Sequence, residues 1–199
     1  MKRLIVASNN AHKIVEIKAI LSKFLFEVVS MKEAGIDIDI VEDGDTFIDN
    51  AVIKAKAIKE IFKDDFVLSD DSGLMVDTLD GAPGVFSARY AGEHGDSDKN
   101  NEKLLREMKG VPQKDRGAQF VCAMCFIDDK GEIINVQGEI RGRIIEDYRG
   151  GSGFGYDPLF FVPDKGMTFA EMGAEEKNSL SHRSRALEKL SNVLMEKKK

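Results

Sequence analysis

The chain has 199 residues, of which 42% are apolar and 32% are charged, and its formal net charge is −6. A chain of this length buries roughly 70% of its unfolded surface, so its core needs no disulfide or metal. The composition is that of a globular protein, and no apolar run approaches the ~20 residues that span a membrane. The acidic balance gives no overall attraction to nucleic acid or to a membrane, so we expect neither as a partner.

The chain begins with MKRLIVASNN, in which two cations precede a short apolar stretch. That stretch is too short for the apolar region of a secretory signal, and polar residues follow at once. We therefore predict a buried strand over residues 2–7 and a cytoplasmic location. Residues 10–24 then carry apolar side chains at helical spacing, which predicts a helix whose apolar face holds Ile14, Ile17, Leu21 and Phe24.

A second strand is predicted over 26–31, followed by the acidic, irregular stretch GIDIDIVEDGD and a helix over 46–62. Thr46 with Asp49 three residues later resembles a capping box, which places the start of this helix. Its apolar face would hold Phe47, Ala51, Ala55, Ile58 and Phe62.

The tetrapeptide DDSG at 70–73 lies between a predicted strand over 66–69 and another over 74–79. Adjacent aspartates on a strand point to opposite faces, so one can face a ligand while the other braces the loop. Mg²⁺ takes one or two protein carboxylates, and Glu42 in the acidic stretch is the obvious second one. An Asx turn that simply ends the strand explains the pattern equally well.

The second half of the chain is predicted to form a helix, three strands and a helix, over 97–108, 117–127, 132–140, 142–147 and 179–196. Ser97 would cap the first of these helices. The turn sequence DDKG joins the first two strands, which should therefore form a hairpin. Helices alternating with strands, together with a hairpin, predict an α/β architecture with a mixed sheet.

Cys122 and Cys125 are the only cysteines, and their C-x-x-C spacing occurs in redox pairs and in half of a zinc site. They lie in the apolar run AQFVCAMCFI, where strand positions three apart point to opposite faces. No second pair exists to complete a zinc site. We therefore predict two buried, small hydrophobic side chains.

The stretch SNNAHK follows the first predicted strand and opens the first helix. A helix N-terminus presents unpaired N–H groups and a partial positive charge, which suits a phosphate. Asn9 and Asn10 can donate hydrogen bonds, and Lys13 would add a full charge. The alternative is that Asn10 merely caps the helix and that Lys13 is solvated.

Two later patterns point to a nucleotide base. In GGSGFGYDP the glycines let the backbone approach a ligand, and Phe154 offers a flat surface for a base. Asp157 can accept hydrogen bonds from base N–H groups, although a flexible turn would need the same glycines. Lys177, His182 and Arg183 place three donors on a short segment. Donors suit a purine with an oxygen at position six and oppose an amino group there.

These patterns occur together and in order, and the chain thereby resembles the inosine/xanthosine triphosphate pyrophosphatase family, the Ham1-like pyrophosphatases. The matching stretches are SNNAHK, EDGDTFIDNAVIKAKA, SDDSGLMVDTLDGAPGVFSARYAG, GFGYDPLF and AEMGAEEKNSLSHRSRA. They run from residue 8 to residue 186, and their combination is far more specific than any one of them.

The resemblance implies one domain over 1–199: a long mixed β-sheet flanked by helices, in two lobes with an active-site cleft between them, assembled as a homodimer. It implies Mg²⁺ held by Glu42 and Asp71, with Asp71 as the proton acceptor for the attacking water. Asp43 competes with Glu42 for its role. The residues that the resemblance implies for substrate binding are Ser8, Asn9, Asn10, Ala11, His12, Lys13, Lys54, Ser72, Phe154, Gly155, Tyr156, Asp157, Lys177, His182 and Arg183.

The implied reaction is hydrolysis of ITP, dITP and XTP to the nucleoside monophosphate and pyrophosphate, which removes them from the nucleotide pool. Three other hypotheses stay open: a Maf-like pyrophosphatase for modified pyrimidine triphosphates, a nucleotide sensor without turnover, and a general phosphohydrolase that releases orthophosphate. The GFGYDP and SHR motifs count against the first. Intact Asp71 and Glu42 count against the second.

Overall fold

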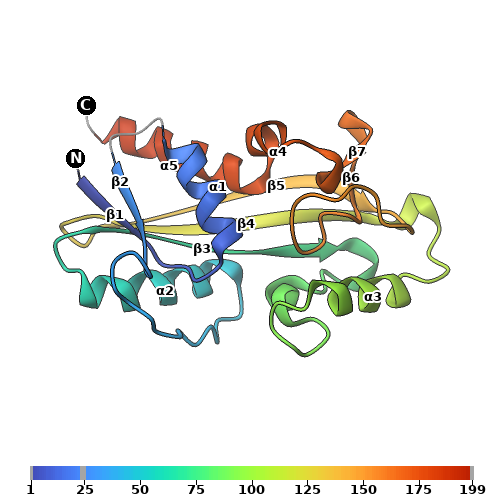
Figure 1. The fold of residues 1–199 in the computed structure, drawn as a ribbon, viewed down its shortest axis with the longest axis horizontal. Helices are drawn as coiled ribbons and strands as arrows, with labels where there is room; N and C mark the ends of the chain where they lie inside the picture. Colours follow the sequence, from blue (N-terminus) through green and yellow to red (C-terminus); the bar gives the residue numbers. More distant parts are fainter. Residues whose placement is uncertain (1, 23–25, 198–199) are drawn as a thin grey trace. The chain divides into compact units, whose positions relative to one another are not determined.

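The computed structural model describes residues 2–22 and 26–197 (Figure 1). The strands in chain order are β1 (Lys2–Val6), β2 (Phe26–Ser30), β3 (Phe66–Val76), β4 (Gly117–Ile127), β5 (Ile133–Ile144), β6 (Phe160–Val162) and β7 (Met167–Thr168). The α-helices are α1 (Ala11–Leu21), α2 (Phe47–Ile61), α3 (Ser97–Glu107), α4 (Ala174–Leu180) and α5 (His182–Glu196). Among the described residues, no helix combines the length and the apolar character that crossing a membrane requires.

The strands form a seven-stranded sheet in the order β2-β1-β3-β4-β5-β6-β7. β2 and β3 pair with β1 in parallel, whereas β6 pairs with β5 and with β7 in antiparallel fashion. The predicted α/β fold with a mixed sheet is therefore confirmed.

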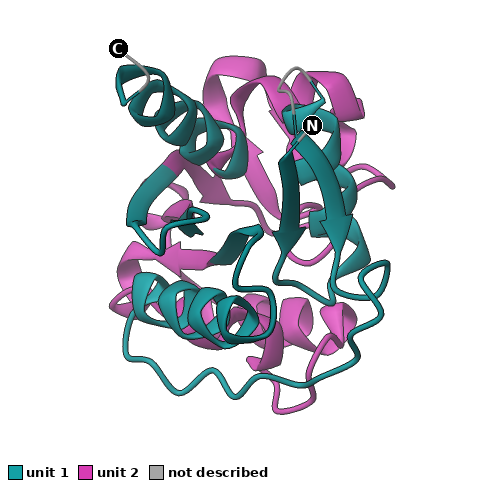
Figure 2. Cartoon of the chain, turned by 90° about the vertical axis from the view of Figure 1, so that its left-hand side faces the viewer, with its two compact units in different colours: residues 1–71, 122–138, 183–199 teal, residues 72–121, 139–182 magenta. Residues whose placement is uncertain are grey.

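The chain divides into two compact units, coloured separately in Figure 2. Unit 1 comprises residues 1–71, 122–138 and 183–199, and unit 2 comprises residues 72–121 and 139–182. Each unit contains its own hydrophobic clusters.

In unit 1 the strands carry apolar side chains on both faces, because helices cover each face. Leu4 of β1 and Leu68 of β3 pack in the cluster that includes residues of α1 and α5, whereas Ile5 and Val67 pack in the cluster that includes residues of α2. Figure 1 shows α1 and α5 above these strands and α2 below them. Alternating side-chain directions along a strand produce this division.

The two cysteines follow the same rule. Cys122 lies in the cluster with α1 and α5, and Cys125 lies in the opposite cluster with α2. Both are buried and free. Burial is also the main cause that raises the pKa of Cys122 to about 12 and that of Cys125 to about 11. The prediction of two small, buried hydrophobic side chains is confirmed.

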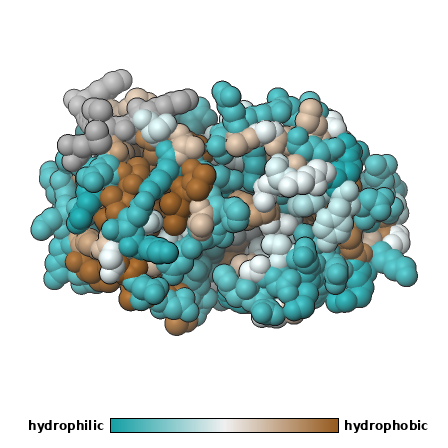
Figure 3. All heavy atoms as spheres, in the orientation of Figure 1, coloured by the Kyte–Doolittle hydropathy of each residue, from teal (hydrophilic) through white to brown (hydrophobic). Residues whose placement is uncertain are grey.

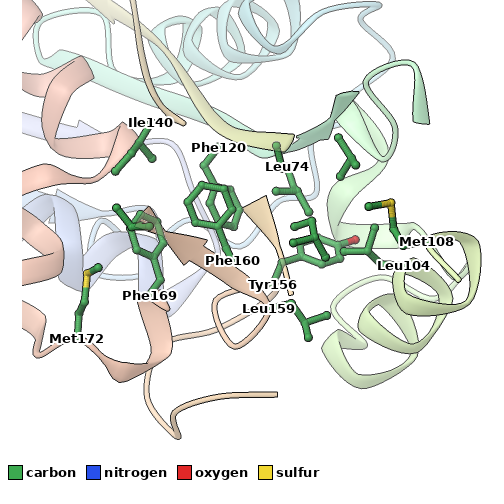
Figure 4. Close-up of a cluster of buried hydrophobic side chains, with 14 residues drawn as sticks. Leu74, Leu104, Met108, Phe120, Ile140, Tyr156, Leu159, Phe160, Phe169 and Met172 are labelled. Atoms are coloured by element: carbon green, nitrogen blue, oxygen red, sulfur yellow. The ribbon is translucent and has the colours of Figure 1, made fainter. Parts of the chain in front are cut away.

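The core of unit 2 is rich in aromatic side chains, as Figure 4 shows. Phe120 of β4, Phe160 of β6 and Phe169 meet there, and Leu104 of α3 packs against the same cluster. Tyr156 also lies within it, with 4% of its surface exposed.

Of the predicted helix starts, those at Asn10 and Thr46 are confirmed, and the one at Ser97 is wrong by a residue. The Asn10 side chain accepts from the backbone N–H of Lys13, and the Thr46 side chain accepts from that of Asp49. Helix α3 is capped by Asp96 and not by Ser97, because the Asp96 carboxylate reaches the backbone N–H of Lys99 at 3.0 Å. Phe24 of the first predicted helix lies outside the described residues.

The break predicted at 70–73 is wrong, since β3 runs without interruption from Phe66 to Val76. Both aspartates stay in the strand because each finds buried partners, which removes the reason for an Asx turn. The predicted strand over 74–79 also ends early, and Asp77–Leu79 forms a short 3-10 helix.

The single helix predicted over 179–196 is in fact two helices. Ser181 is the C-cap of α4, with an extended ψ of 160°, and α5 begins at the next residue. Lys177 therefore belongs to α4, whereas His182 and Arg183 open α5. The extended backbone at one residue was not visible in the apolar spacing.

Candidate active site

The centre of the site in unit 1 is Asp70, which is fully buried on β3. Its Oδ2 lies 3.2 Å from the Lys13 ammonium and accepts from the Arg183 guanidinium at 3.1 Å. Arg183 is also ion-paired with Glu16 of α1. Burial alone would raise the pKa of Asp70, but Lys13, Arg183 and Lys54 outweigh it and hold the pKa below its ordinary value. Asp70 is therefore an ionised anchor for two cations.

The Lys13 side chain is only 14% exposed, so the interpretation in which it is solvated is wrong. Burial disfavours its charge, but Asp70 counteracts this and the pKa of Lys13 is raised. The turn before it is ordered by short polar bonds: the Asn10 N–H donates to the Ser8 hydroxyl, and the Asn9 amide donates to the Ile38 carbonyl. The start of α1 thus combines backbone N–H groups with a fixed positive charge.

Asp71 points to the other face of β3, toward α2. Its Oδ2 accepts from the Asn50 amide at 3.0 Å, and its Oδ1 lies 3.9 Å from the Lys54 ammonium. Burial is the largest influence on Asp71 and raises its pKa, against the opposing charges of Lys54 and Lys13. A carboxylate with a raised pKa is a better proton acceptor than an ordinary one. The prediction that neighbouring aspartates face opposite sides is confirmed.

Glu42 approaches the same ammonium, since its Oε2 lies 2.9 Å from Nζ of Lys54. The irregular segment before α2 comes close to that helix at Gly44, whose N–H donates to the Asn50 side chain. A Cβ at Gly44 would lie 2.7 Å from the Cβ of Asp49, so only glycine allows this approach. Of the two neighbouring acids, Glu42 makes the contact with Lys54.

Glu42 and Asp71 therefore converge on one position that already attracts a cation. Two carboxylates fit Mg²⁺, which completes its shell with water and phosphate oxygens. Within residues 2–22 and 26–197, no group of three or more His, Cys, Asp and Glu side chains is placed to hold a metal. The residues present suit a hydrated ion bound through two carboxylates.

The site in unit 2 centres on a buried ion pair between Asp157 and Lys177, 2.7 Å apart. The same Asp157 oxygen accepts from the backbone N–H of Phe154 at 2.9 Å, which fixes the loop before it. The Lys177 ammonium also lies 4.8 Å from the centre of the Phe154 ring. One loop, one carboxylate and one ammonium thus hold the half-buried Phe154 ring in place.

The rest of this loop is tied to the core of unit 2. The Asn101 amide of α3 donates to the Gly155 carbonyl at 3.0 Å, and the Tyr156 hydroxyl donates to the Ser87 carbonyl at 2.8 Å. The Tyr156 ring is buried and its hydroxyl is used within the core of unit 2. Its role in binding stays a prediction.

His182 is buried and stacks on Phe120, with ring centroids 4.9 Å apart and planes 13° apart. Ser72, the next residue on β3 after Asp71, is half-buried. In unit 1 the predicted residues that the structure brings together are Lys13, Lys54, Glu42, Asp71 and Arg183. In unit 2 they are Phe154, Asp157 and Lys177.

Several residues of these networks were missed by the sequence analysis: Glu16, Asn50, Asp70 as a charge anchor, Asn101 and Phe120. Asn50 and Glu16 lie on helices and meet β3 or α5 only through the fold, so no local pattern marks them. Asp70 carried a signal, because two adjacent acids in an apolar strand cannot both be solvated.

A model of the Ham1 family matches residues 4–193 of the chain. The chain belongs to the Ham1 family. It is 55% identical to a dITP/XTP pyrophosphatase of Clostridium perfringens, over 98% of each chain. It is 54% identical to a protein of the same name from Clostridium tetani, over 98% of this chain and 96% of that one.

Solved structures agree with this family membership. The Staphylococcus aureus Ham1 protein is 38% identical, with a TM-score of 0.87 over 98% of this Ham1-family chain and all of the other. A Ham1 protein from Coxiella burnetii is equally similar in sequence, with a TM-score of 0.86. The α/β fold implied by the resemblance is confirmed.

Proposed function

We propose that this chain hydrolyses non-standard purine nucleoside triphosphates, namely ITP, dITP and XTP, to the monophosphate and pyrophosphate. The observation that carries the proposal is the cluster on β3, where a proton acceptor, Asp71, stands beside fixed cations. The curated relatives named dITP/XTP pyrophosphatase support the same substrate class. Removal of such nucleotides from the pool is the corresponding role.

In this proposal the triphosphate binds at the start of α1. Backbone N–H groups of SNNAHK and the ammonium of Lys13 neutralise phosphate oxygens. Lys54 supplies a second ammonium close to Asp71. Phosphoryl transfer demands chiefly position and charge from the protein, and these groups provide both.

Asp71 accepts a proton from the attacking water, and the Asn50 amide holds its carboxylate in orientation. The water oxygen bonds to the α-phosphorus, the bond from that phosphorus to the bridging oxygen breaks, and pyrophosphate leaves. The proton resides on Asp71 until it passes to solvent. General-base catalysis of this kind contributes ~10²–10⁴-fold to a rate.

We also propose that Glu42 and Asp71 hold Mg²⁺. When bound there, the ion would neutralise charge on the phosphate oxygens and help to orient them. The ammonium of Lys54 lies near both carboxylates, so Glu42 and Asp71 would contact Lys54 and the ion together.

In this proposal the purine base binds to residues of unit 2, in the loop that holds Phe154 and at the helix residues Lys177 and His182. Phe154 offers its ring face for stacking, Asp157 accepts from base N–H groups, and Lys177 and His182 donate toward the 6-oxo group. Arg183 belongs to the same recognition segment in the family pattern, and its side chain is held by Asp70. An adenine would leave these donors unpaired, and such a mismatch is worth about 10⁴-fold in discrimination.

Product analysis tests the proposal directly. ITP, dITP, XTP, GTP and ATP are each incubated with the protein, with and without Mg²⁺, and the products are separated. We expect metal-dependent IMP, dIMP or XMP with pyrophosphate, and little turnover of ATP and GTP. Orthophosphate would favour the general phosphohydrolase, turnover of modified pyrimidines the Maf-like hypothesis, and binding without turnover the sensor.

A homodimer and a cytoplasmic location also remain proposals. Figure 3 shows apolar residues gathered on the visible face over elements of unit 1, with hydrophilic residues around them. Val15 and Val41 of unit 1 are exposed by 67% and 76%. Sedimentation velocity should give twice the mass of one chain; a single-chain mass at micromolar concentration would remove the dimer from the proposal.

A further inference from the structure

We infer that Phe120 is a positioning residue for base recognition, because its ring fixes the plane of the His182 imidazole. The inference rests on the proposed function, in which His182 donates to the 6-oxo group of the purine. Phe120 itself lies on β4 and is 7% exposed, within the aromatic core of unit 2 (Figure 4).

The stack is nearly parallel. The His182 ring lies 4.9 Å from the Phe120 ring at an interplanar angle of 13°, and 6.4 Å from the Phe169 ring at 18°. Phe120 and Phe169 lie 5.6 Å apart at 7°. Three rings therefore share one orientation, and the imidazole cannot turn about its long axis without striking the Phe120 face.

Phe120 is itself held by a tilted neighbour. The Phe160 ring lies 4.6 Å from Phe120 at 57° and 5.1 Å from Phe169 at 50°. Such tilted contacts suit the quadrupoles of aromatic rings. Phe160 has room because residue 142 of β5 is glycine, where a Cβ would lie 2.6 Å from the Phe160 ring.

The plane of an imidazole sets the direction of its hydrogen bonds, since both nitrogens lie in that plane. Rotation of a histidine ring about its last side-chain bond is broad, so the backbone alone does not fix it. The Ser181 N–H closes the last turn of α4 on the Lys177 carbonyl at 3.0 Å, which fixes the backbone just before His182. The Phe120 ring then selects one imidazole plane. That plane sets the direction in which His182 can donate a hydrogen bond to a purine oxygen.

The test replaces the ring by an aliphatic side chain and compares two positions. Phe120→Leu is paired with Phe126→Leu, a change at a buried phenylalanine of unit 1 that stacks on Phe66 at 5.5 Å and 25°. The readout is the ratio of kcat/KM for dITP to that for dATP, together with the urea midpoint. We expect Phe120→Leu to lower the ratio at least tenfold, mainly through KM for dITP. Phe126→Leu should lower the midpoint and leave the ratio unchanged.

A measurement on the unaltered chain keeps the inference testable if Phe120→Leu does not fold. The chain has three histidines, and His12 and His94 are exposed, so their ring signals serve as internal references. A proton over the face of an aromatic ring is shifted upfield. The His182 ring protons should therefore lie upfield of the other two sets in the NMR spectrum.

The outcomes separate the inference from the proposed function. If the unaltered chain does not discriminate dITP from dATP, the proposed recognition fails. If His182→Ala abolishes discrimination while Phe120→Leu retains it, the recognition stands and the positioning role of Phe120 is overturned. Ring protons of His182 at the positions of exposed histidines would overturn it as well.

Discussion

The candidate site of unit 1 consists mainly of charged side chains, whereas that of unit 2 consists mainly of aromatic ones. In unit 1, Asp70 and Asp71 are held by ammonium, guanidinium and amide groups from three helices. In unit 2, a single ion pair between Asp157 and Lys177 lies among aromatic rings. A charged site depends on every partner being present, because an unpaired buried charge is costly. The aromatic site depends on the orientation of its rings, so the loss of one ring is expected to weaken base recognition.

The largest expected effect on turnover is that of Asp71→Asn in unit 1. An amide cannot accept the proton of the attacking water, so kcat should fall by ~10²–10⁴-fold. The fold should persist, because the amide still fills the same space beside Asn50. Steady-state kinetics and circular dichroism measure both effects.

The control for this change is Asp64→Asn, at an exposed residue just before β3. It removes the same charge from the same unit and should leave kcat unchanged. Turnover of Asp71→Asn close to that of the unaltered chain would refute the catalytic assignment.

Asp70→Asn should act on stability. The change removes the carboxylate that pairs with both Lys13 and Arg183. Removing one partner of a buried ion pair costs about 3–5 kcal/mol of unfolding free energy. In unit 2, Asp77→Asn breaks an exposed ion pair with Arg141, whose side chain is 57% exposed. That change should cost about 0–1 kcal/mol. Urea denaturation of both variants checks the contrast, which equal losses would contradict.

Phe154→Leu should act on affinity in unit 2. Stacking of a base on an aromatic ring is worth about 1–3 kcal/mol, so KM for dITP should rise roughly tenfold or more. Because the ring is half-buried, the unfolding free energy should change little. Phe86→Leu, at a ring 57% exposed in the same unit, is the matched control. A fall in kcat without a change in KM would argue against the stacking role.

Two further effects, equal in size, are expected at helix caps, one in each unit. Thr46→Ala removes the cap of α2 in unit 1, and Asp96→Ala removes the cap of α3 in unit 2. Each loses one hydrogen bond to a backbone N–H, which costs about 1 kcal/mol. Urea denaturation should show similar losses, and a much larger loss at one cap would reveal a further role for that residue.

The sequence predicted the features that depend on local spacing. A short apolar run identified β1, alternating side-chain directions placed Cys122 and Cys125 on opposite faces, and the caps at Asn10 and Thr46 followed from residue type. The paired acids of DDSG were predicted to be functional residues. The strand was nevertheless predicted to end there, because aspartate favours turns when only the local sequence is considered. Its partners lie on α1, α2 and α5, and only the fold brings them near.

The helix at the end of the chain failed for a related reason. Leu187, Leu190 and Leu194 give a clear helical stripe, which was extended backward across Ser181. A single extended residue changes the direction of the chain without changing its composition. Phe120 was likewise not singled out, since nothing in the run AQFVCAMCFI distinguishes a ring that packs from a ring that orients a histidine.

The chain passes from one unit to the other after residues 71, 121, 138 and 182. The first and last of these positions separate Asp71 from Ser72 and His182 from Arg183, so residues that are adjacent in the chain belong to different units. Neither unit is encoded by one continuous stretch of the gene, so a single exchange of DNA cannot transfer a whole unit to another protein. A single exchange of a gene segment would therefore divide both units, whereas a point substitution alters one side chain and leaves the course of the chain through both units unchanged.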